Sequence, residues 1–209
     1  MSPRLIECEQ GSAEWFAARA GMPTASEFAT ILAKGKDGKS ESVTRRKYML
    51  QLAGEILTGE PVESYSNAHM ERGKALEDEA RRAYAFMHDA DPQRVGFIVN
   101  GDKGCSPDSL LGKNGGLEIK TKLPHLLIDA LLKDDMPPEH KAQVQGSMWV
   151  CEREWWDFVA YWPKLPLFVK RIHRDDGYIA NLAGAVSTFN AELAETVERI
   201  RAFDRREAA

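Results

Sequence analysis

The sequence predicts a mixed α/β protein in which a central β-sheet is flanked by helices. Helical periodicity dominates residues 1–90, short alternating or β-branched segments follow over residues 91–174, and residues 175–209 form one long apolar-periodic helix. Strands interleaved with helices pack as a covered sheet. We therefore expect a single domain over residues 1–209, with a helical N-terminal part, a core of sheet and helices, and a C-terminal helix.

The N-terminal part divides into four predicted helices. Ser12 is a typical N-cap for the first helix, and Thr24 or Ser26 begins the second. Apolar residues at helical spacing predict a third helix over 44–57 and a longer fourth helix over 67–88. In the remainder, we expect strands at 94–99, 116–121, 155–162 and 167–174, and helices at 123–132, from Pro138, and over 175–205.

Composition and charge are those of an ordinary globular protein. The chain is 43% hydrophobic and 29% charged, with a formal net charge of −4. The overall charge therefore does not favour a nucleic-acid partner, and DNA affinity would need a local basic surface. Basic clusters in residues 34–39 and 45–47 either supply that surface or are solvated loop and helix faces.

Cysteine usage and hydropathy indicate the compartment. Cys8, Cys105 and Cys151 are widely spaced and form neither a disulfide framework nor a zinc pattern, which favours a reducing compartment. No apolar run reaches membrane-spanning length, and the N-terminus lacks the apolar core of a signal peptide. We expect a cytoplasmic protein without a membrane partner.

The segment SPDSLLGKNGGLEIKTK carries the strongest candidate for chemistry. Pro107 and Asp108 begin a turn, and an alternating strand follows in which Glu118, Lys120 and Lys122 share one face. Glu118 and Lys120 are roughly 6.6 Å apart along such a strand. If the turn folds back beside the strand, Asp108 joins them in the pattern PD…ExK.

Two carboxylates and a lysine suit phosphodiester hydrolysis. A hard divalent cation such as Mg²⁺ prefers oxygen ligands and stabilises charge that develops on phosphoryl oxygens. The lysine orients the attacking water or helps to deprotonate it. Alternatively, Asp108 is an ordinary turn residue and the Glu-x-Lys pair is a solvated strand face. The motif alone leaves both interpretations open.

Two helices carry further candidates. Glu77 lies beside the apolar stripe of its predicted helix and either completes an acidic cluster or pairs with Arg81 one turn later. Gln143, on the helix that follows the strand, either faces the site or belongs to a polar helix face.

The sequence contains four blocks in the following order: EWFAARAGMPTASEF, ERGKALEDEAR, CSPDSLLGKNGGLEIKTK and AQVQGSMWV. In this order and spacing, the chain resembles the lambda exonuclease family of phage-type recombination nucleases from about residue 14 to residue 161. That family belongs to the PD-(D/E)xK nuclease superfamily. The resemblance therefore implies a restriction-endonuclease-like core.

The resemblance also implies an activity. It points to a Mg²⁺-dependent 5′–3′ exonuclease that acts on linear double-stranded DNA, releases 5′-mononucleotides and leaves 3′ single-stranded overhangs. Two Mg²⁺ ions are implied, and Mn²⁺ is expected to substitute for them. The implied partners are double-stranded DNA ends and a single-strand annealing recombinase, and the implied assembly is a homotrimeric ring around DNA.

The resemblance assigns roles in the acidic cluster by motif. Asp108 and Glu118 match metal ligands, and the backbone carbonyl of Ile119 matches a third. Glu77 matches a further member of the cluster, and Lys120 matches the residue that assists the water.

The same correspondence implies roles outside the acidic cluster. Gln143 matches a glutamine position near the site. Arg19, Ser26 and Ser106 match residues that hold the terminal 5′-phosphate, a role that guanidinium and hydroxyl donors suit. Met70 matches an apolar wedge that splits the strands. The family has a branched aliphatic residue there, so an ordinary helix-core methionine remains the alternative.

Other functions stay open. A restriction-type endonuclease of the same superfamily would use the same acids without an end-binding pocket. The iron–sulfur branch of these nucleases needs four ligating cysteines, whereas this chain has three. A non-catalytic DNA-end-binding recombination adaptor would not require Asp108, Glu118 and Lys120 to be intact.

Overall fold

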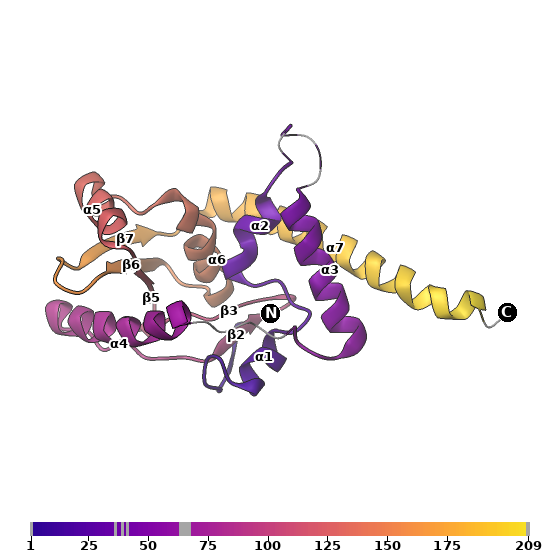
Figure 1. Ribbon diagram of the computed structural model, residues 1–209, viewed down its shortest axis with the longest axis horizontal. Coiled ribbons are helices and arrows are strands. Elements are labelled where there is room, and N and C mark those ends of the chain that lie inside the picture. Colours follow the sequence, from indigo (N-terminus) through magenta and orange to yellow (C-terminus); the bar gives the residue numbers. More distant parts are fainter. Residues whose placement is uncertain (1, 36, 39, 41, 63–67, 208–209) are drawn as a thin grey trace.

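The computed structural model describes residues 2–35, 37, 38, 40, 42–62 and 68–207 (Figure 1). Its elements follow in this order: β1 (Arg4–Ile6), α1 (Ala13–Arg19), η1 (Ala25–Glu27), α2 (Phe28–Leu32), α3 (Val43–Thr58), α4 (Ala68–His88), β2 (Phe97–Asn100), β3 (Lys103–Cys105), β4 (Ser109–Leu111), β5 (Gly115–Thr121), α5 (Pro124–Lys133), η2 (Pro138–His140), α6 (Lys141–Cys151), β6 (Trp155–Tyr161), β7 (Phe168–His173) and α7 (Asp176–Glu207).

The strands confirm the predicted mixed α/β class and divide into two sheets. One sheet has the order β4-β5-β6-β7, with a parallel β5–β6 pair at its centre and antiparallel pairs at both edges. The other is an antiparallel sheet of β1, β2 and β3. The strands β1, β3 and β4 were not expected from the sequence, because three residues are too few to show an alternating pattern.

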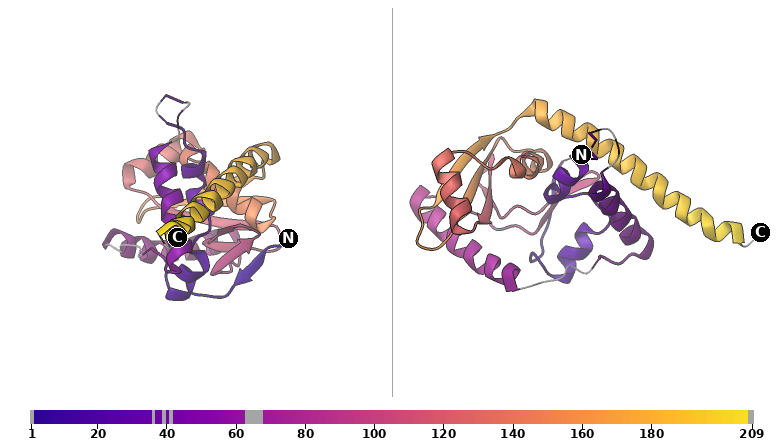
Figure 2. Two further views of the ribbon diagram at one scale, coloured as in Figure 1. Left: turned by 90° about the vertical axis from the view of Figure 1, so that its right-hand side faces the viewer. Right: turned by 45° about the horizontal axis from the view of Figure 1, so that its top comes forward.

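Helices cover both faces of the four-stranded sheet. Strand side chains alternate between faces, so Trp156 and Phe158 are buried on the side of α6, in a core that includes Met148. Val159 points the other way and packs with Tyr84 of α4. Figure 2 shows α4 along one side of this sheet and α6 on the other. The two faces of β5 and β6 therefore have separate environments.

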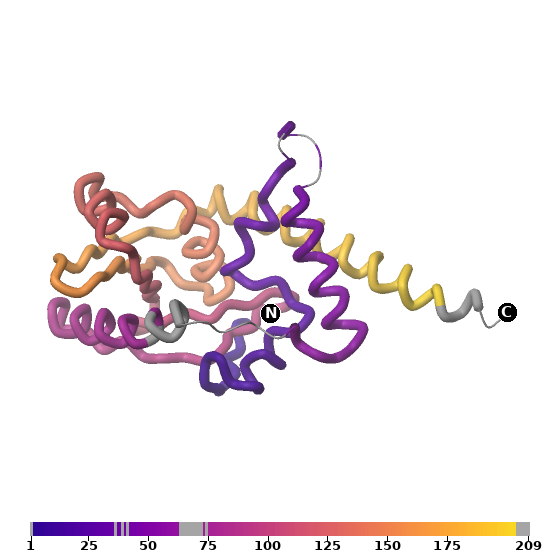
Figure 3. The backbone as a smooth tube through the Cα atoms, in the orientation of Figure 1, coloured from indigo at the N-terminus to yellow at the C-terminus, as the bar shows by residue number. Residues whose placement is uncertain are grey.

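The helix α7 joins the sheet-containing core to the N-terminal helices. It packs on α2, α3 and α6, and then extends beyond the body of the molecule (Figures 1 and 3). Burial of each large apolar side chain contributes roughly 1.5–3 kcal/mol relative to exposure. The buried apolar residues recur at helical spacing, as predicted: Ile179, Leu182, Val186, Phe189, Leu193 and Val197.

Capping residues define the helix boundaries. The Ser12 side chain accepts a hydrogen bond from the Trp15 N–H at 3.2 Å, which confirms the predicted cap of α1. Ser42 caps α3, two residues before the predicted start, and Gly59 ends this helix in the left-handed region at φ 72°. Over the described ranges, none of the helices has the length and apolar character needed to cross a bilayer.

Candidate active site

The turn before β4 folds back beside β5, so Asp108 lies next to Ile119. The Oδ2 atom of Asp108 accepts a hydrogen bond from the Ile119 N–H at 2.5 Å. Strand β4 pairs with β5 only as far as Ser109 opposite Leu117, so Asp108 lies just beyond the end of this pairing. The N–H and C=O of a strand residue point to the same side. The Ile119 carbonyl therefore faces the side of the strand on which Asp108 lies.

Glu118 is a buried carboxylate with one satisfied oxygen and one unsatisfied oxygen. It is 1% exposed. Its Oε1 atom accepts hydrogen bonds from the Gln143 side chain at 2.6 Å and from Lys120 Nζ at 2.7 Å. Its Oε2 atom is buried and has no partner among the described residues. An unpaired buried polar group typically costs about 1–3 kcal/mol, and more when it is charged, so this oxygen marks a position that a cation would complete.

Burial and the neighbouring carboxylates shift the pKa values of Asp108 and Lys120. Burial raises the pKa of Asp108 well above its usual value, and the negative charges of Glu118 and Glu77 raise it further, against the opposing effects of Lys120 and the Ile119 N–H. Burial alone would lower the pKa of Lys120, but the carboxylates of Glu118, Asp108 and Glu77 raise it above normal. The site therefore concentrates negative charge around a single protonated amine.

Glu77 reaches this site indirectly. It forms an ion pair with Arg81, the helical pairing that was one of its two interpretations, and its charge still acts on Asp108. Arg81 is buried, pairs with Asp78 at 2.6 Å, and donates to the Ser109 hydroxyl at 3.0 Å and the Asp108 carbonyl at 3.3 Å. Arg81 thus fixes α4 to the turn that carries Asp108. The sequence did not reveal this role, because it does not show that a helical arginine is buried.

The side-chain carboxylates alone are too few to bind a divalent cation, so a backbone carbonyl and water molecules must supply the remaining ligands. In the part of the chain that the structure describes, no three His, Cys, Asp or Glu side chains form a ready-made metal cluster. Asp108, Glu118 and the Ile119 carbonyl offer oxygen atoms from one small region. Mg²⁺ usually binds through one or two carboxylates and keeps several waters. The unpaired Glu118 oxygen and the carboxylate repulsion agree with such an ion.

A second polar group lies at the end of α1. The Arg19 guanidinium stacks on the Trp15 ring, with its central carbon 3.9 Å from the ring centroid. The Trp15 indole N–H donates to the Ser106 hydroxyl at 2.8 Å. Burial lowers the pKa of Arg19, and no hydrogen bond or ion pair joins its guanidinium to another described residue. Arg19 lines a cavity of about 460 Å³ together with Lys47 and other residues of α1 and α3.

The other predicted end-binding residues lie around this group. Ser26 is exposed, and its hydroxyl is 3.2 Å from that of Thr24, which lines the same cavity. Ser106 precedes Asp108 by two residues and so connects the cavity to the acidic site. Met70 falls within the bounds of α4, but its side chain is outside the described residues, so its predicted wedge role has no structural counterpart here.

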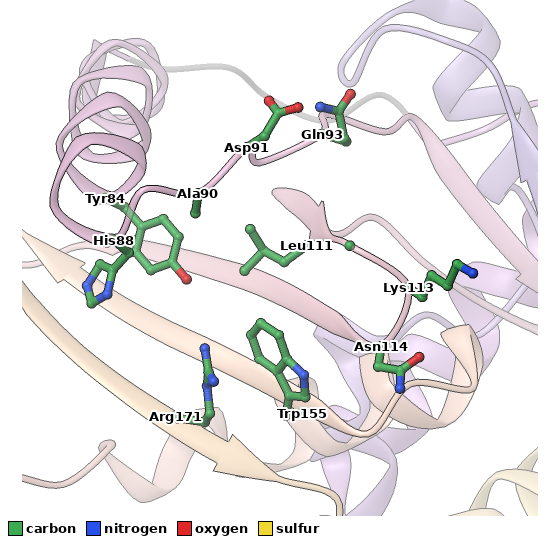
Figure 4. A pocket seen from close by; sticks show the side chains of 11 residues that line it. Tyr84, His88, Ala90, Asp91, Gln93, Leu111, Lys113, Asn114, Trp155 and Arg171 are labelled. Atoms are coloured by element: carbon green, nitrogen blue, oxygen red, sulfur yellow. The ribbon is translucent and has the colours of Figure 1, made fainter.

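A larger cavity lies on the opposite face of the sheet, beside α4. It has a volume of about 730 Å³ and is lined by Tyr84, His88, Trp155 and Arg171 among others (Figure 4). Under it, the buried Asp157 accepts hydrogen bonds from Arg171 at 2.8 and 2.9 Å and from the Tyr84 hydroxyl at 2.6 Å. The sequence did not predict this polar network, because its members are 14 or more residues apart.

Comparison with known families agrees with this geometry. The model of the YqaJ-like viral recombinase domain matches residues 14–154. The chain belongs to this family. Membership confirms the expected relation to the lambda exonuclease family, and with it a nuclease of phage-type recombination. YqaJ-like and related nucleases typically use divalent metal ions.

Solved structures support the same family. The crystal structure of LHK-Exo in complex with dAMP is 36% identical to this YqaJ-like chain, with a TM-score of 0.84 over 93% of this chain and 99% of the other. An alkaline exonuclease (LHK-Exo) from Laribacter hongkongensis is 34% identical, with a TM-score of 0.83 and the same coverage.

A more distant structure shares the fold alone. A phage related exonuclease from Haemophilus somnus 129PT is 14% identical, with a TM-score of 0.64 over 86% of this chain and 96% of the other. The search of curated proteins gave no match.

Proposed function

We propose that this chain is a Mg²⁺-dependent 5′–3′ exonuclease that acts on the ends of linear double-stranded DNA. It releases 5′-mononucleotides and leaves 3′ single-stranded overhangs for recombination by strand annealing. The observation that carries this proposal is the convergence of Asp108 and Lys120 on Glu118, a buried carboxylate that has one oxygen without a partner among the described residues. The dAMP complex of LHK-Exo, a 36% identical relative, supports a mononucleotide product.

In this proposal, Asp108, Glu118 and the Ile119 carbonyl hold one or two Mg²⁺ ions, and Mn²⁺ can replace them. Bound Mg²⁺ supplies Lewis-acid stabilisation of the phosphoryl oxygens and lowers the pKa of water. The Gln143 amide holds Oε1 of Glu118 and so fixes the orientation of the carboxylate. Lys120 remains protonated and donates toward the charge that develops on the reacting phosphate.

Recognition of the DNA end is assigned to Arg19, Ser106 and Ser26. A half-buried guanidinium without an anionic partner among the described residues suits a phosphate, which it binds through two parallel hydrogen bonds. Ser106 is linked to Arg19 through Trp15 and precedes Asp108 by only two residues. This short connection would hold the terminal phosphate at a fixed distance from the cleaved bond.

The proposed assembly and partners are those that the resemblance to the lambda exonuclease family implies. We propose a homotrimeric ring around DNA, a single-strand annealing recombinase as partner, and action of residues 1–209 as one nuclease domain in the cytoplasm. A closed ring would reconcile a net charge of −4 with DNA binding, because basic residues would gather along the inner surface.

The proposal is tested by the products of one digestion. Linear duplex carrying a single 5′-phosphate is incubated with the protein in Mg²⁺ or in EDTA, and the products are sized. We expect mononucleotides from the phosphorylated strand in Mg²⁺ and no products in EDTA. Closed circular DNA, incubated in parallel with Mg²⁺, should remain intact. Cleavage of circular DNA would indicate a restriction-type endonuclease instead, and intact DNA in Mg²⁺ would indicate a non-catalytic end-binding adaptor.

Arg19 gives a specific prediction about end recognition. Arg19→Gln should lower the rate on 5′-phosphorylated ends by about tenfold or more and leave the rate on 5′-hydroxyl ends nearly unchanged, because a charge-assisted hydrogen bond contributes about 1.5–3 kcal/mol. Arg82→Gln, at an exposed position on α4, is the matched control. If the ratio of the two rates is the same in Arg19→Gln as in the wild type, Arg19 does not bind the terminal 5′-phosphate.

A further inference from the structure

The residue directly after β5 continues the face of Glu118 and Lys120. Lys122 follows at the same two-residue step, and its backbone N–H donates to the Tyr161 carbonyl at 3.1 Å. Its Nζ atom lies 2.7 Å from the Nε2 atom of His140 and 3.3 Å from a carboxylate oxygen of Glu139. Lys122 is thus held in a defined position, with 15% of its side chain exposed.

The contact between Lys122 and His140 repeats the one between Glu118 and Gln143. His140 comes three residues before Gln143, directly before α6, so both side chains reach β5 from one side of the same helical segment. The His140 ring also stacks on Phe158, with 5.0 Å between the ring centroids. These two contacts therefore fix a row of polar groups along β5 and the residue that follows it.

The row presents two ammonium groups. Burial, Lys122 and Lys120 lower the pKa of His140 to about 4, so its imidazole is neutral at neutral pH and accepts a hydrogen bond from Lys122. Glu139 is mostly exposed, and an ion pair with an exposed partner contributes little. The Lys122 ammonium is therefore available to an anion that displaces Glu139.

We propose that Lys122, positioned by His140, binds a backbone phosphate next to the phosphate that is cleaved. This role rests on the proposed nuclease function. Alternate strand residues lie about 6.6 Å apart, a step of the same order as that between successive phosphates on one DNA strand. With the cleaved phosphate at Lys120, the adjacent phosphate reaches Lys122. The group bound by Lys122 is a phosphodiester of the DNA backbone. Its contact with Lys122 sets the register of the DNA strand in the active site.

The first test is the salt dependence of DNA binding in an Asp108→Asn background. Lys122→Met should weaken binding of linear duplex by about three- to tenfold and reduce the slope of log affinity against log salt by about 0.9, the value for one lost phosphate contact. Lys133→Met is the matched control, because Lys133 is also paired with a carboxylate, Asp129, at 2.7 Å. An unchanged slope in Lys122→Met would overturn the proposal.

The second test identifies the phosphate. Neutral methylphosphonates replace single phosphates on either side of the cleaved bond, and affinities are compared with and without Lys122→Met. At one flanking position, the neutral linkage should weaken DNA binding by the protein that retains Lys122. The same linkage should have no further effect on binding by the Lys122→Met variant. Equal losses in both backgrounds at both flanking positions would refute a contact from Lys122.

A purely structural role for Lys122 gives a different pattern. If Lys122 only fastens Glu139 to β5, Glu139→Gln should lower thermal stability and DNA affinity as much as Lys122→Met does. We expect Glu139→Gln to bind DNA as tightly as the parent or more tightly, because it removes a competitor for the ammonium. The nuclease function is judged separately: absence of Mg²⁺-dependent cleavage by the wild type would refute it, whatever Lys122 does, and continued cleavage by Asp108→Asn would refute the ligand role of Asp108.

Discussion

Two buried carboxylates on adjacent strands of the same sheet differ in how completely their oxygens are hydrogen-bonded. Glu118 of β5 and Asp157 of β6 are 1% and 2% exposed and point to opposite faces. Both oxygens of Asp157 are satisfied, by the Arg171 guanidinium and the Tyr84 hydroxyl. Glu118 has two donors on one oxygen and none, among the described residues, on the other.

This contrast indicates that incomplete hydrogen bonding of a buried carboxylate identifies the candidate site better than its burial does. Buried polar groups in folded proteins are nearly always hydrogen-bonded, and the exceptions call for an explanation. Asp157 follows the rule, and the cavity above it is lined by an arginine already engaged by Asp157 and Trp155 (Figure 4). Glu118 is the exception, and it lies beside Lys120 and interacts electrostatically with Asp108.

The largest expected effect separates the candidate site, which includes Asp108, from the Asp157 network by activity. Asp108→Asn should reduce cleavage by about a thousandfold or more, because it removes a proposed ligand of the ion that stabilises the transition state. Its thermal unfolding temperature in EDTA should equal or exceed that of the wild type, because carboxylate repulsion is relieved.

The matched control is Asp157→Asn, which should cleave at nearly the wild-type rate per folded molecule. Single-turnover rates and thermal unfolding curves would check both variants. A wild-type cleavage rate in Asp108→Asn would contradict the assignment of Asp108 to the active site.

A smaller effect should appear in stability on the other face. Arg171→Met leaves the Asp157 charge buried with only the Tyr84 hydroxyl. Loss of one partner of a buried pair costs about 3–5 kcal/mol, and the half-exposed Arg171 side chain reduces this to about 2 kcal/mol through solvent screening. Urea denaturation would measure the change in the free energy of unfolding. Arg201→Met, which removes the exposed pair with Glu198, should change it by less than about 0.5 kcal/mol.

The smallest effect concerns pH in the metal-free protein. Burial, Glu118 and Glu77 raise the pKa of Asp108 in the folded state, so the folded protein holds a proton that the unfolded chain releases. The stability from this group is fully present below its unfolded pKa of about 3.9 and is lost as pH rises through the folded value. In EDTA, the free energy of unfolding should fall over this range more steeply in the wild type than in Asp108→Asn. Parallel curves would contradict this assignment.

Local patterns predicted the parts of the fold that depend on neighbouring residues. The alternation around Glu118 predicted β5, and the helical spacing of apolar residues predicted α7. The turn at Asp108 also folds back beside β5, as the motif required. These features follow from side-chain direction and turn chemistry, which a single segment already contains.

Features that depend on distant residues were beyond sequence analysis. The burial of Arg81 and its contact with the Asp108 carbonyl join residues 27 positions apart, and the Tyr84–Asp157 hydrogen bond spans 73. His140 gave no signal of a contact with Lys122, because an isolated histidine is usually a surface or core residue. Such pairings become visible only when packing brings the elements together.

The central claim is that the unpaired oxygen of Glu118 is completed by a divalent cation, and calorimetric titration with Mg²⁺ tests it most directly. The wild type and Asp157→Asn should bind Mg²⁺ with similar affinity, whereas Glu118→Gln should lose measurable binding. Equal Mg²⁺ binding by Glu118→Gln and the wild type would contradict the account.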